Sequence, residues 1–234
     1  MLWLRSLLFS IFFIGYVPIA SSLCIPALLL PLKYRHGLVR FFLGIIISVL
    51  TVLCGIRYTV KGLENIPKDR TGVILSKHQS AWETFLLPLL FHEPAAIVKR
   101  ELLWVPFFGW GLAVIEPIVI NRKARSSAMQ QIIAKGMRAL KEGRWVLIFP
   151  EGTRTAMGQV GQYKLGGARL AVAAECPVIP VAHNAGRFWP KRKFTKQPGI
   201  VQVVIGPPIE SAHRTPEEVM QLAKTWIEET MQTL

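Results

Sequence analysis

Residues 73–83 read Val-Ile-Leu-Ser-Lys-His-Gln-Ser-Ala-Trp-Glu. The first four form an apolar run typical of a buried strand, and Trp82 to Phe91 show the pattern of a helix. His78 therefore lies in the turn between a strand and a helix, where α/β proteins commonly place their chemistry. On one regular helix, His78 and Glu83 would lie about 140° apart, so their pairing requires His78 to precede the helix.

Two interpretations of this turn stay open. Glu83 can accept from one imidazole nitrogen and leave the other as a base, or it can close a capping box with Ser80. It can do both only if its oxygens are shared between the Ser80 backbone N–H and the ring. The chain's only aspartate is Asp69, so no aspartate can replace Glu83 here. Ser80 as a nucleophile is a weaker option, because no elbow of small residues surrounds it.

The rest of the chain after Arg57 alternates short apolar runs with amphipathic stretches, which predicts one α/β domain. Several runs are continuously apolar, so we expect a central, mostly parallel sheet flanked by helices on both faces. The expected strands are 72–76, 95–98, 115–120, 145–149, 178–182 and 200–205. The expected helices are 82–91, 124–141, 165–174 and 216–231.

The N-terminus is strongly apolar. No charge occurs between Ser6 and Leu32, and these 27 residues would span roughly 40 Å as a helix. Prolines at 18, 26 and 31 predict a helix over about 2–16 followed by a kinked piece. A second uncharged run, 41–56, has 16 residues, too few for the roughly 30 Å bilayer core. We divide the chain into a membrane-associated helical hairpin, 1–57, and a body, 58–234.

The cations between the two runs restrict the hairpin's orientation. Two full spans would place Lys33, Arg35 and Arg40 across the membrane from the body, against the positive-inside tendency. A hairpin dipping into one leaflet, or one span plus one interfacial helix, avoids this by keeping the cations near cytoplasmic headgroups. A cleaved secretory signal, with Arg5 before the apolar stretch, is the alternative.

Composition identifies the class of partner. The chain has 28 Lys and Arg against 14 Asp and Glu, a net charge of +14, while 51% of its residues are hydrophobic. This combination favours an anionic membrane surface over nucleic acid. The three cysteines show no spacing typical of zinc or disulfides, which fits a reducing compartment.

Residues 149–155, Phe-Pro-Glu-Gly-Thr-Arg-Thr, also follow an apolar run. Glycine lets the backbone approach a ligand, threonines supply hydroxyls, and Arg154 offers the planar fork suited to phosphate oxygens. Lys99 and Arg122, at the ends of expected strands, are further phosphate contacts. A surface turn is the alternative for this loop.

The apolar stretch 102–110 is either a groove for a greasy substrate or a membrane-contacting face.

Residues 187–196 contain five cations and no acid. This stretch is either a solvated loop or a docking surface for lipid headgroups or an acidic carrier.

With these segments in order, the chain resembles the bacterial 1-acyl-sn-glycerol-3-phosphate acyltransferases of the glycerolipid acyltransferase family. The resemblance covers about residues 58–210, in four blocks: Lys77-His78-Gln79-Ser80-Ala81-Trp82-Glu83, Lys99 through Arg122, Phe149 through Arg154, and Val178 through Val181. Two positions depart from the family pattern. Glu83 replaces the usual aspartate and Lys77 the common asparagine, which leaves the imidazole geometry and the acceptor class open.

The resemblance implies acyl transfer from a thioester to the sn-2 hydroxyl of lysophosphatidate, forming phosphatidate, with His78 as base and Glu83 as its partner. It implies no cofactor and no metal, a donor that is acyl-CoA or acyl carrier protein, and a place at the inner membrane's cytoplasmic side. The alternatives are acylation of another lysolipid and a non-catalytic membrane-binding protein. The implied substrate-binding residues are Lys99, Arg122, Glu151, Gly152, Thr153 and Arg154, with Glu151 and Gly152 shaping the loop.

Overall fold

The computed structural model describes residues 1–121 and 125–234. Its centre is a seven-stranded sheet with the order β1-β7-β6-β2-β5-β3-β4. All neighbouring strands are parallel except β6 and β7. The strands are β1 (Ile56–Lys61), β2 (Val73–Ser76), β3 (Ala95–Lys99), β4 (Ile118–Ile120), β5 (Val146–Ile148), β6 (Val178–His183) and β7 (Gly199–Ile205). The predicted α/β class with a mostly parallel sheet is confirmed.

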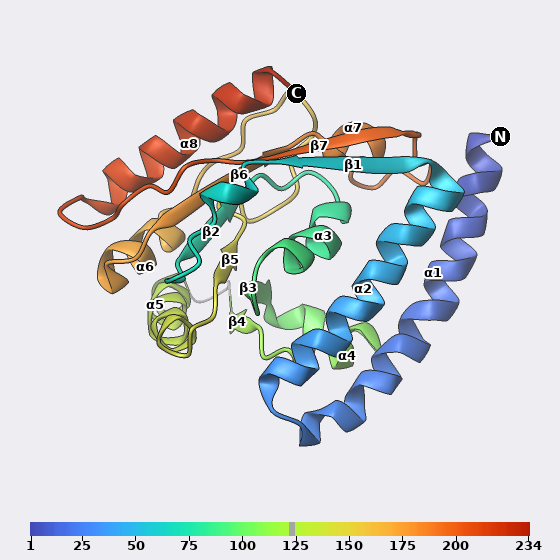
Figure 1. Ribbon diagram of the computed structural model, residues 1–234, viewed down its shortest axis with the longest axis horizontal. Coiled ribbons are helices and arrows are strands. Elements are labelled where there is room, and N and C mark those ends of the chain that lie inside the picture. The colour runs from blue at the N-terminus through green and yellow to red at the C-terminus, as the bar shows by residue number, and fades with distance from the viewer. Residues whose placement is uncertain (122–124) are drawn as a thin grey trace.

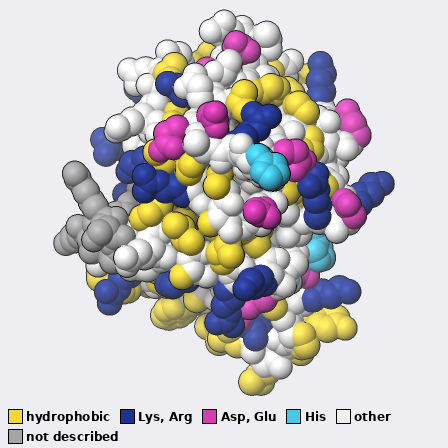
Figure 2. All heavy atoms as spheres, turned by 90° about the vertical axis from the view of Figure 1, so that its left-hand side faces the viewer, with side chains coloured by type: hydrophobic (Ala, Val, Ile, Leu, Met, Phe, Trp, Pro, Cys, Tyr) yellow, Lys and Arg dark blue, Asp and Glu magenta, His cyan; other side chains and the backbone are white. Residues whose placement is uncertain are grey.

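Helices cover both faces of this sheet (Figure 1). On one face lie α5 (Arg125–Lys141), α6 (Gly166–Ala174) and α8 (Pro216–Gln232), and on the other α3 (Trp82–Leu90) packs with the N-terminal helices. Because both faces are covered, every residue of β2, β5 and β6 is buried. The side that bears α5, α6 and α8 carries interspersed acidic and basic side chains, as Figure 2 shows. The short helices are α4 (Phe108–Val114), α7 (Ala185–Phe188) and the 3-10 turns η1 (Ile25–Leu29), η2 (Leu63–Asn65) and η3 (Arg100–Trp104).

The N-terminal hairpin consists of α1 (Leu2–Cys24) and α2 (Leu32–Cys54), joined by η1. The predicted end of the first helix near residue 16 is wrong, because α1 continues through Pro18. A proline removes only one intrahelical hydrogen bond, and contact with α2 supports the helix around it. In that contact the Tyr16 hydroxyl donates to the Phe42 carbonyl at 3.1 Å. Helix α2 also begins well before the second apolar run, so it includes Lys33, Arg35 and Arg40.

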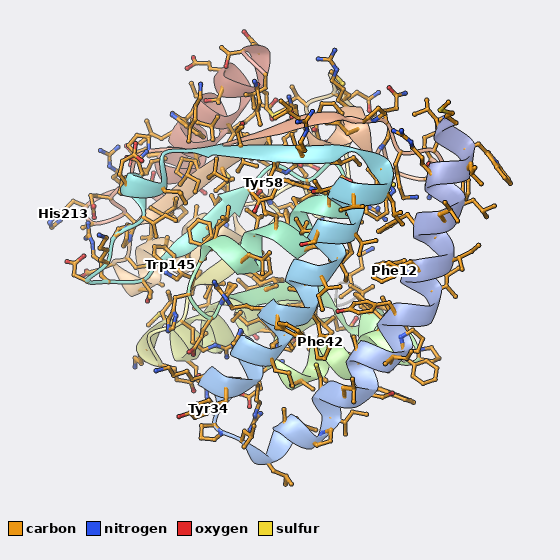
Figure 3. The ribbon with its side chains drawn as sticks, turned by 45° about the vertical axis from the view of Figure 1, so that its right-hand side comes forward. Phe12, Tyr34, Phe42, Tyr58, Trp145 and His213 are labelled. Carbon is orange, nitrogen blue, oxygen red and sulfur yellow. The ribbon has the colours of Figure 1, made fainter. Side chains whose placement is uncertain are left out.

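By length and composition, the segments Leu2–Leu29 and Leu32–Cys54 could each cross a membrane. Only 22% of the most apolar window of each is buried, so most of their apolar surface faces outward. The inward side chains of both helices join the core that contains Trp82. Phe12 stacks on Tyr16 of the same helix with ring centroids 4.8 Å apart, and Tyr16 meets the edge of Phe42 on α2. Figure 3 labels Phe12 and Phe42 on the two helices. The predicted domain division at residue 57 falls one residue after β1 begins, and it stays a prediction.

The short helices α4 and α7 were not predicted, and two strands of the body differ from expectation. Strand β1 was not predicted, because its sequence Ile-Arg-Tyr-Thr-Val-Lys is mostly polar and only Ile56 is fully buried. Strand β4 starts at Ile118 rather than Ile115. Glu116 adopts a left-handed conformation (φ 48°) and the next residue is a proline, so these two residues form a turn after α4.

Candidate active site

His78 lies in the turn between β2 and α3, at the carboxyl end of the strand. Its Nδ1 is 2.8 Å from Oε1 of Glu83. The same carboxylate accepts the backbone N–H groups of Gln79 at 2.9 Å and of Ser80 at 2.8 Å. Glu83 therefore pairs with the imidazole and also accepts the Ser80 N–H. The capping box itself is incomplete, because Ala81 is the N-cap of α3 and the Ser80 hydroxyl accepts the Trp82 N–H rather than that of Glu83. With Nδ1 engaged, Nε2 is the nitrogen that can take a proton from a bound hydroxyl.

The Glu83 side chain is almost fully buried, with 1% exposed. Burial alone raises its pKa, but the hydrogen bond and charge of His78 and the hydrogen bond from the Ser80 N–H outweigh burial, so the pKa of Glu83 lies below its ordinary value. The carboxyl is therefore ionised at neutral pH. Burial lowers the pKa of His183, which favours a neutral ring. Since Nδ1 of His183 accepts the Ala185 N–H, its Nε2 donates to the Lys77 carbonyl at 2.8 Å.

A second group of contacts fixes His78 from the loop after β5. The Phe149 ring stacks on the imidazole with centroids 4.1 Å apart and planes inclined by 20°. Glu151 Oε2 accepts the His78 backbone N–H at 2.9 Å, and Thr155 donates to the His78 carbonyl. His78 is thus held at its ring and at its main chain.

His78 lines a cavity of about 420 Å³ whose two ends differ chemically. One end is polar and cationic, and is formed by Lys99, Gly152, Thr153, Arg154 and Lys191. The other end is apolar and reaches α1 and α2, where its walls include Phe13, Tyr16, Phe42, Leu43 and Ile46. A molecule with an anionic head and a hydrocarbon chain would find matching walls in such a cavity, whose lining also includes the imidazole.

Most of the predicted site residues meet at this cavity. His78, Lys99, Gly152, Thr153 and Arg154 all line it. The Glu151 carboxylate points instead to the main chain of His78 and to Lys77. Arg122 lies outside the described residues. Ser80 is buried and its hydroxyl accepts the Trp82 N–H at 3.2 Å, a position that does not suit a nucleophile.

Sequence reasoning missed two residues of the site. Phe149 was quoted only as part of its loop. Lys191 was one of five cations in a basic stretch, and no signal distinguished it from its neighbours. Its ammonium donates to the Arg154 carbonyl at 2.8 Å and to the Thr153 hydroxyl at 3.3 Å. Lys196, from the same stretch, is buried against the rings of Phe9, Trp189 and Phe194, so it is not available for docking.

Comparison with known proteins agrees with this geometry. The Acyltransferase family model matches residues 57–184, a range that contains the imidazole, its carboxylate and the loop after β5. The chain belongs to the acyltransferase family. This acyltransferase is 48% identical over 207 residues to the 1-acyl-sn-glycerol-3-phosphate acyltransferase of Pseudomonas aeruginosa, a match that covers 87% of the chain and 80% of that relative.

More distant relatives extend the comparison. The human 1-acyl-sn-glycerol-3-phosphate acyltransferase alpha is 29% identical over 214 residues, which cover 91% of this acyltransferase and 75% of the human protein. The crystal structure of the 1-acyl-sn-glycerophosphate acyltransferase of Thermotoga maritima superposes with a TM-score of 0.82 at 26% identity, covering 98% of this chain and 94% of the other. The match includes the N-terminal helices as well as the sheet.

Proposed function

We propose that the protein acylates the sn-2 hydroxyl of 1-acyl-sn-glycerol 3-phosphate, taking the acyl group from a thioester and forming phosphatidate. The observation that carries this proposal is the position of His78 in a cavity with a cationic end and an apolar end. Lysophosphatidate has the same order of groups: a phosphate, a free hydroxyl and a hydrocarbon chain. The names of the relatives support the same acceptor.

The two ends of the cavity bind different parts of the acceptor. Arg154, Lys99 and Lys191 attract the acceptor phosphate, and Arg154 can bind two of its oxygens at once. The aromatic and aliphatic walls from α1 and α2 take hydrocarbon. Binding at both ends would hold the free hydroxyl beside His78, and such positioning supplies a large part of the rate.

The chemical step is direct transfer. The acceptor oxygen attacks the thioester carbonyl carbon while Nε2 of His78 takes the hydroxyl proton. The carbon–sulfur bond then breaks, and the thiolate leaves and takes the proton from the imidazolium. Glu83 stabilises the imidazolium through the 2.8 Å contact at Nδ1. Acyl-CoA and acyl carrier protein are the thioesters that we propose as donors, with no cofactor.

The membrane arrangement that we propose is a hairpin inserted from the cytoplasmic side of the inner membrane without crossing it. Contacts along the length of the hairpin support this arrangement. Arg40 of α2 donates to the carbonyls of Pro88, Leu89 and Phe91, and Arg35 forms an ion pair with Glu116 at 2.9 Å. Two full spans would separate these arginines from the body by a bilayer.

A further apolar surface lies beside the hairpin. Trp104 is 66% exposed and Trp110 47%, and Val105 and Phe107 between them are also exposed. Helix α4 approaches α1 so closely that a Cβ on Gly111 would lie 2.6 Å from the Ser21 hydroxyl. The exposed side chains of η3 and α4 therefore extend the apolar face of α1, and tryptophan is typical of the membrane interface.

An acyl-transfer assay with three acceptors tests the function. The detergent-solubilised protein receives a labelled acyl-CoA with lysophosphatidate, glycerol 3-phosphate or monoacylglycerol. We expect transfer to lysophosphatidate alone and none in His78→Ala. Efficient transfer to monoacylglycerol would refute the phosphate site at Arg154, and full activity of His78→Ala would refute the base.

A further inference from the structure

A buried ammonium group lies immediately before the base. The Lys77 side chain is 1% exposed, and its Nζ lies 2.8 Å from Glu151 Oε1, 2.8 Å from Glu228 Oε1 and 3.3 Å from the Gln159 carbonyl. The ammonium donates hydrogen bonds to Glu228 and to the Gln159 carbonyl and forms an ion pair with Glu151, so it has three partners. They belong to the loop after β5 and to α8, so one side chain joins the catalytic turn to two distant segments.

The nearer carboxylate acts on the main chain of His78. Oε1 of Glu151 forms an ion pair with Lys77 and accepts the Thr155 hydroxyl, and its Oε2 accepts the His78 N–H. Thr155 donates its own N–H to the His78 carbonyl at 2.8 Å. The orientation of this carboxylate therefore decides where the backbone of the base lies. Without a cation, a carboxylate buried this deeply would be strongly destabilised.

The farther carboxylate belongs to α8. Glu228 accepts from the Tyr163 hydroxyl at 2.6 Å as well as from Lys77. Burial and this hydrogen bond raise the pKa of Tyr163, so the phenol keeps the proton that it donates. Glu228 is thus fixed from two sides, and it determines the position of the ammonium relative to the sheet.

We propose that Lys77, anchored by Glu228 of α8, is a positioning residue for His78 and acts through Glu151. The proposal rests on the proposed function only in that His78 is the base. An error of 1 Å in the position of a base can reduce the rate about 100-fold, so a shift of a few tenths of an ångström measurably lowers kcat. None of the three side chains lines the cavity, so we expect their replacement to change kcat more than substrate affinity.

The first test is Glu228→Gln, with Glu229→Gln as its matched control. Glutamine preserves the shape and the acceptor oxygen but removes the charge, and Glu229 is the exposed neighbour on the same helix. We expect Glu228→Gln to lower kcat about 5- to 20-fold per folded molecule, with both KM values within twofold of the original, because a charge-assisted contact becomes a neutral one. Glu229→Gln should match the unmodified enzyme.

A second test asks whether Lys77 acts through Glu151. Lys77→Met alone leaves a buried carboxylate without its cation and endangers the fold, so it is made in the Glu151→Gln background, where that charge is absent. If the two residues act in series, Lys77→Met/Glu151→Gln and Glu151→Gln have the same kcat within twofold.

Three results would overturn the proposal. These are an unchanged kcat in Glu228→Gln, a rise of KM without loss of kcat, and a further loss of kcat when Lys77→Met is added to Glu151→Gln. Failure of the proposed function has a different signature, because His78→Ala would then stay active whatever the Lys77 variants do.

Discussion

Replacing Glu83 by glutamine separates the charge of this side chain from its geometry. Oε1 accepts from His78, Gln79 and Ser80 at 2.8–2.9 Å, and a glutamine oxygen in the same place can keep all three hydrogen bonds. What disappears is the negative charge that faces the imidazolium during transfer. We therefore expect a folded protein with a strongly reduced kcat.

The burial of the pair sets the size of this effect. Converting a charge-assisted hydrogen bond to a neutral one costs about 1–2 kcal/mol, and an ion pair about 4 Å apart at an effective dielectric constant near 20 is worth about 4 kcal/mol. A loss of about 2–4 kcal/mol in transition-state stabilisation corresponds to about a 30- to 900-fold decrease in kcat.

The assay is acyl transfer to lysophosphatidate at saturating concentrations of both substrates, with circular dichroism to verify folding. Ser80→Ala is the control, because it alters the same turn without touching the charge. It should lose about 1 kcal/mol of stability through its contact with the Trp82 N–H and keep kcat within threefold. A folded Glu83→Gln protein with more than a third of the original kcat would show that the carboxylate charge does not stabilise the imidazolium. A Ser80→Ala protein without turnover would reopen the serine as a nucleophile.

Four other outcomes follow from the same geometry. Trp104→Ser and Trp110→Ser should each weaken vesicle association about fivefold in a sedimentation assay, since an apolar side chain half-buried in the membrane contributes on the order of 1 kcal/mol. Unchanged association would show that η3 and α4 do not contact the membrane. Arg154→Gln should raise KM for lysophosphatidate about 10- to 100-fold, and Arg154→Lys should recover only part of this loss, whereas equal KM values in all three proteins would contradict phosphate binding. Phe149→Ala should lower kcat about 3- to 10-fold through the lost stacking on His78, and an unchanged kcat would assign the ring to packing alone. The pKa of Glu83 is lower in the folded state, so the ionised carboxylate contributes its full stability above the ordinary pKa of 4.5 and loses it as the pH falls through the lowered value. The thermal unfolding temperature should therefore decline more steeply below pH 4.5 in the unmodified protein than in Glu83→Gln. Parallel curves for the two proteins would argue against the lowered pKa.

The sequence predicts the sheet well where local patterns and tertiary burial agree. The strands that form β2, β5 and β6 are continuous apolar runs, and they are buried on both faces. The pattern fails at β1, whose polar residues pair with β7 at the edge of the sheet. It also fails at Pro18, where local chemistry indicates a break but packing against α2 continues the helix.

The candidate site, like the sheet, could be predicted from the sequence only in part. The pairing of His78 with Glu83 depends on neighbours in the chain, so spacing and turn geometry indicate it as one of two interpretations, between which the structure decides. Lys191 and Glu228 approach the site from segments far along the chain. No local pattern indicates which of several surface cations folds back onto the loop after β5, or which glutamate of α8 turns inward.

The hairpin packs into the core and also forms one wall of the cavity. Phe9, Ile47 and Leu50 pack against the body, and other side chains of the same helices line the cavity. Deleting residues 1–55 would therefore not release a water-soluble enzyme that merely lacks its attachment. It would uncover the core and open the cavity, so detergent could not restore turnover to the fragment. In this protein, solubility and catalysis cannot be engineered as separable properties.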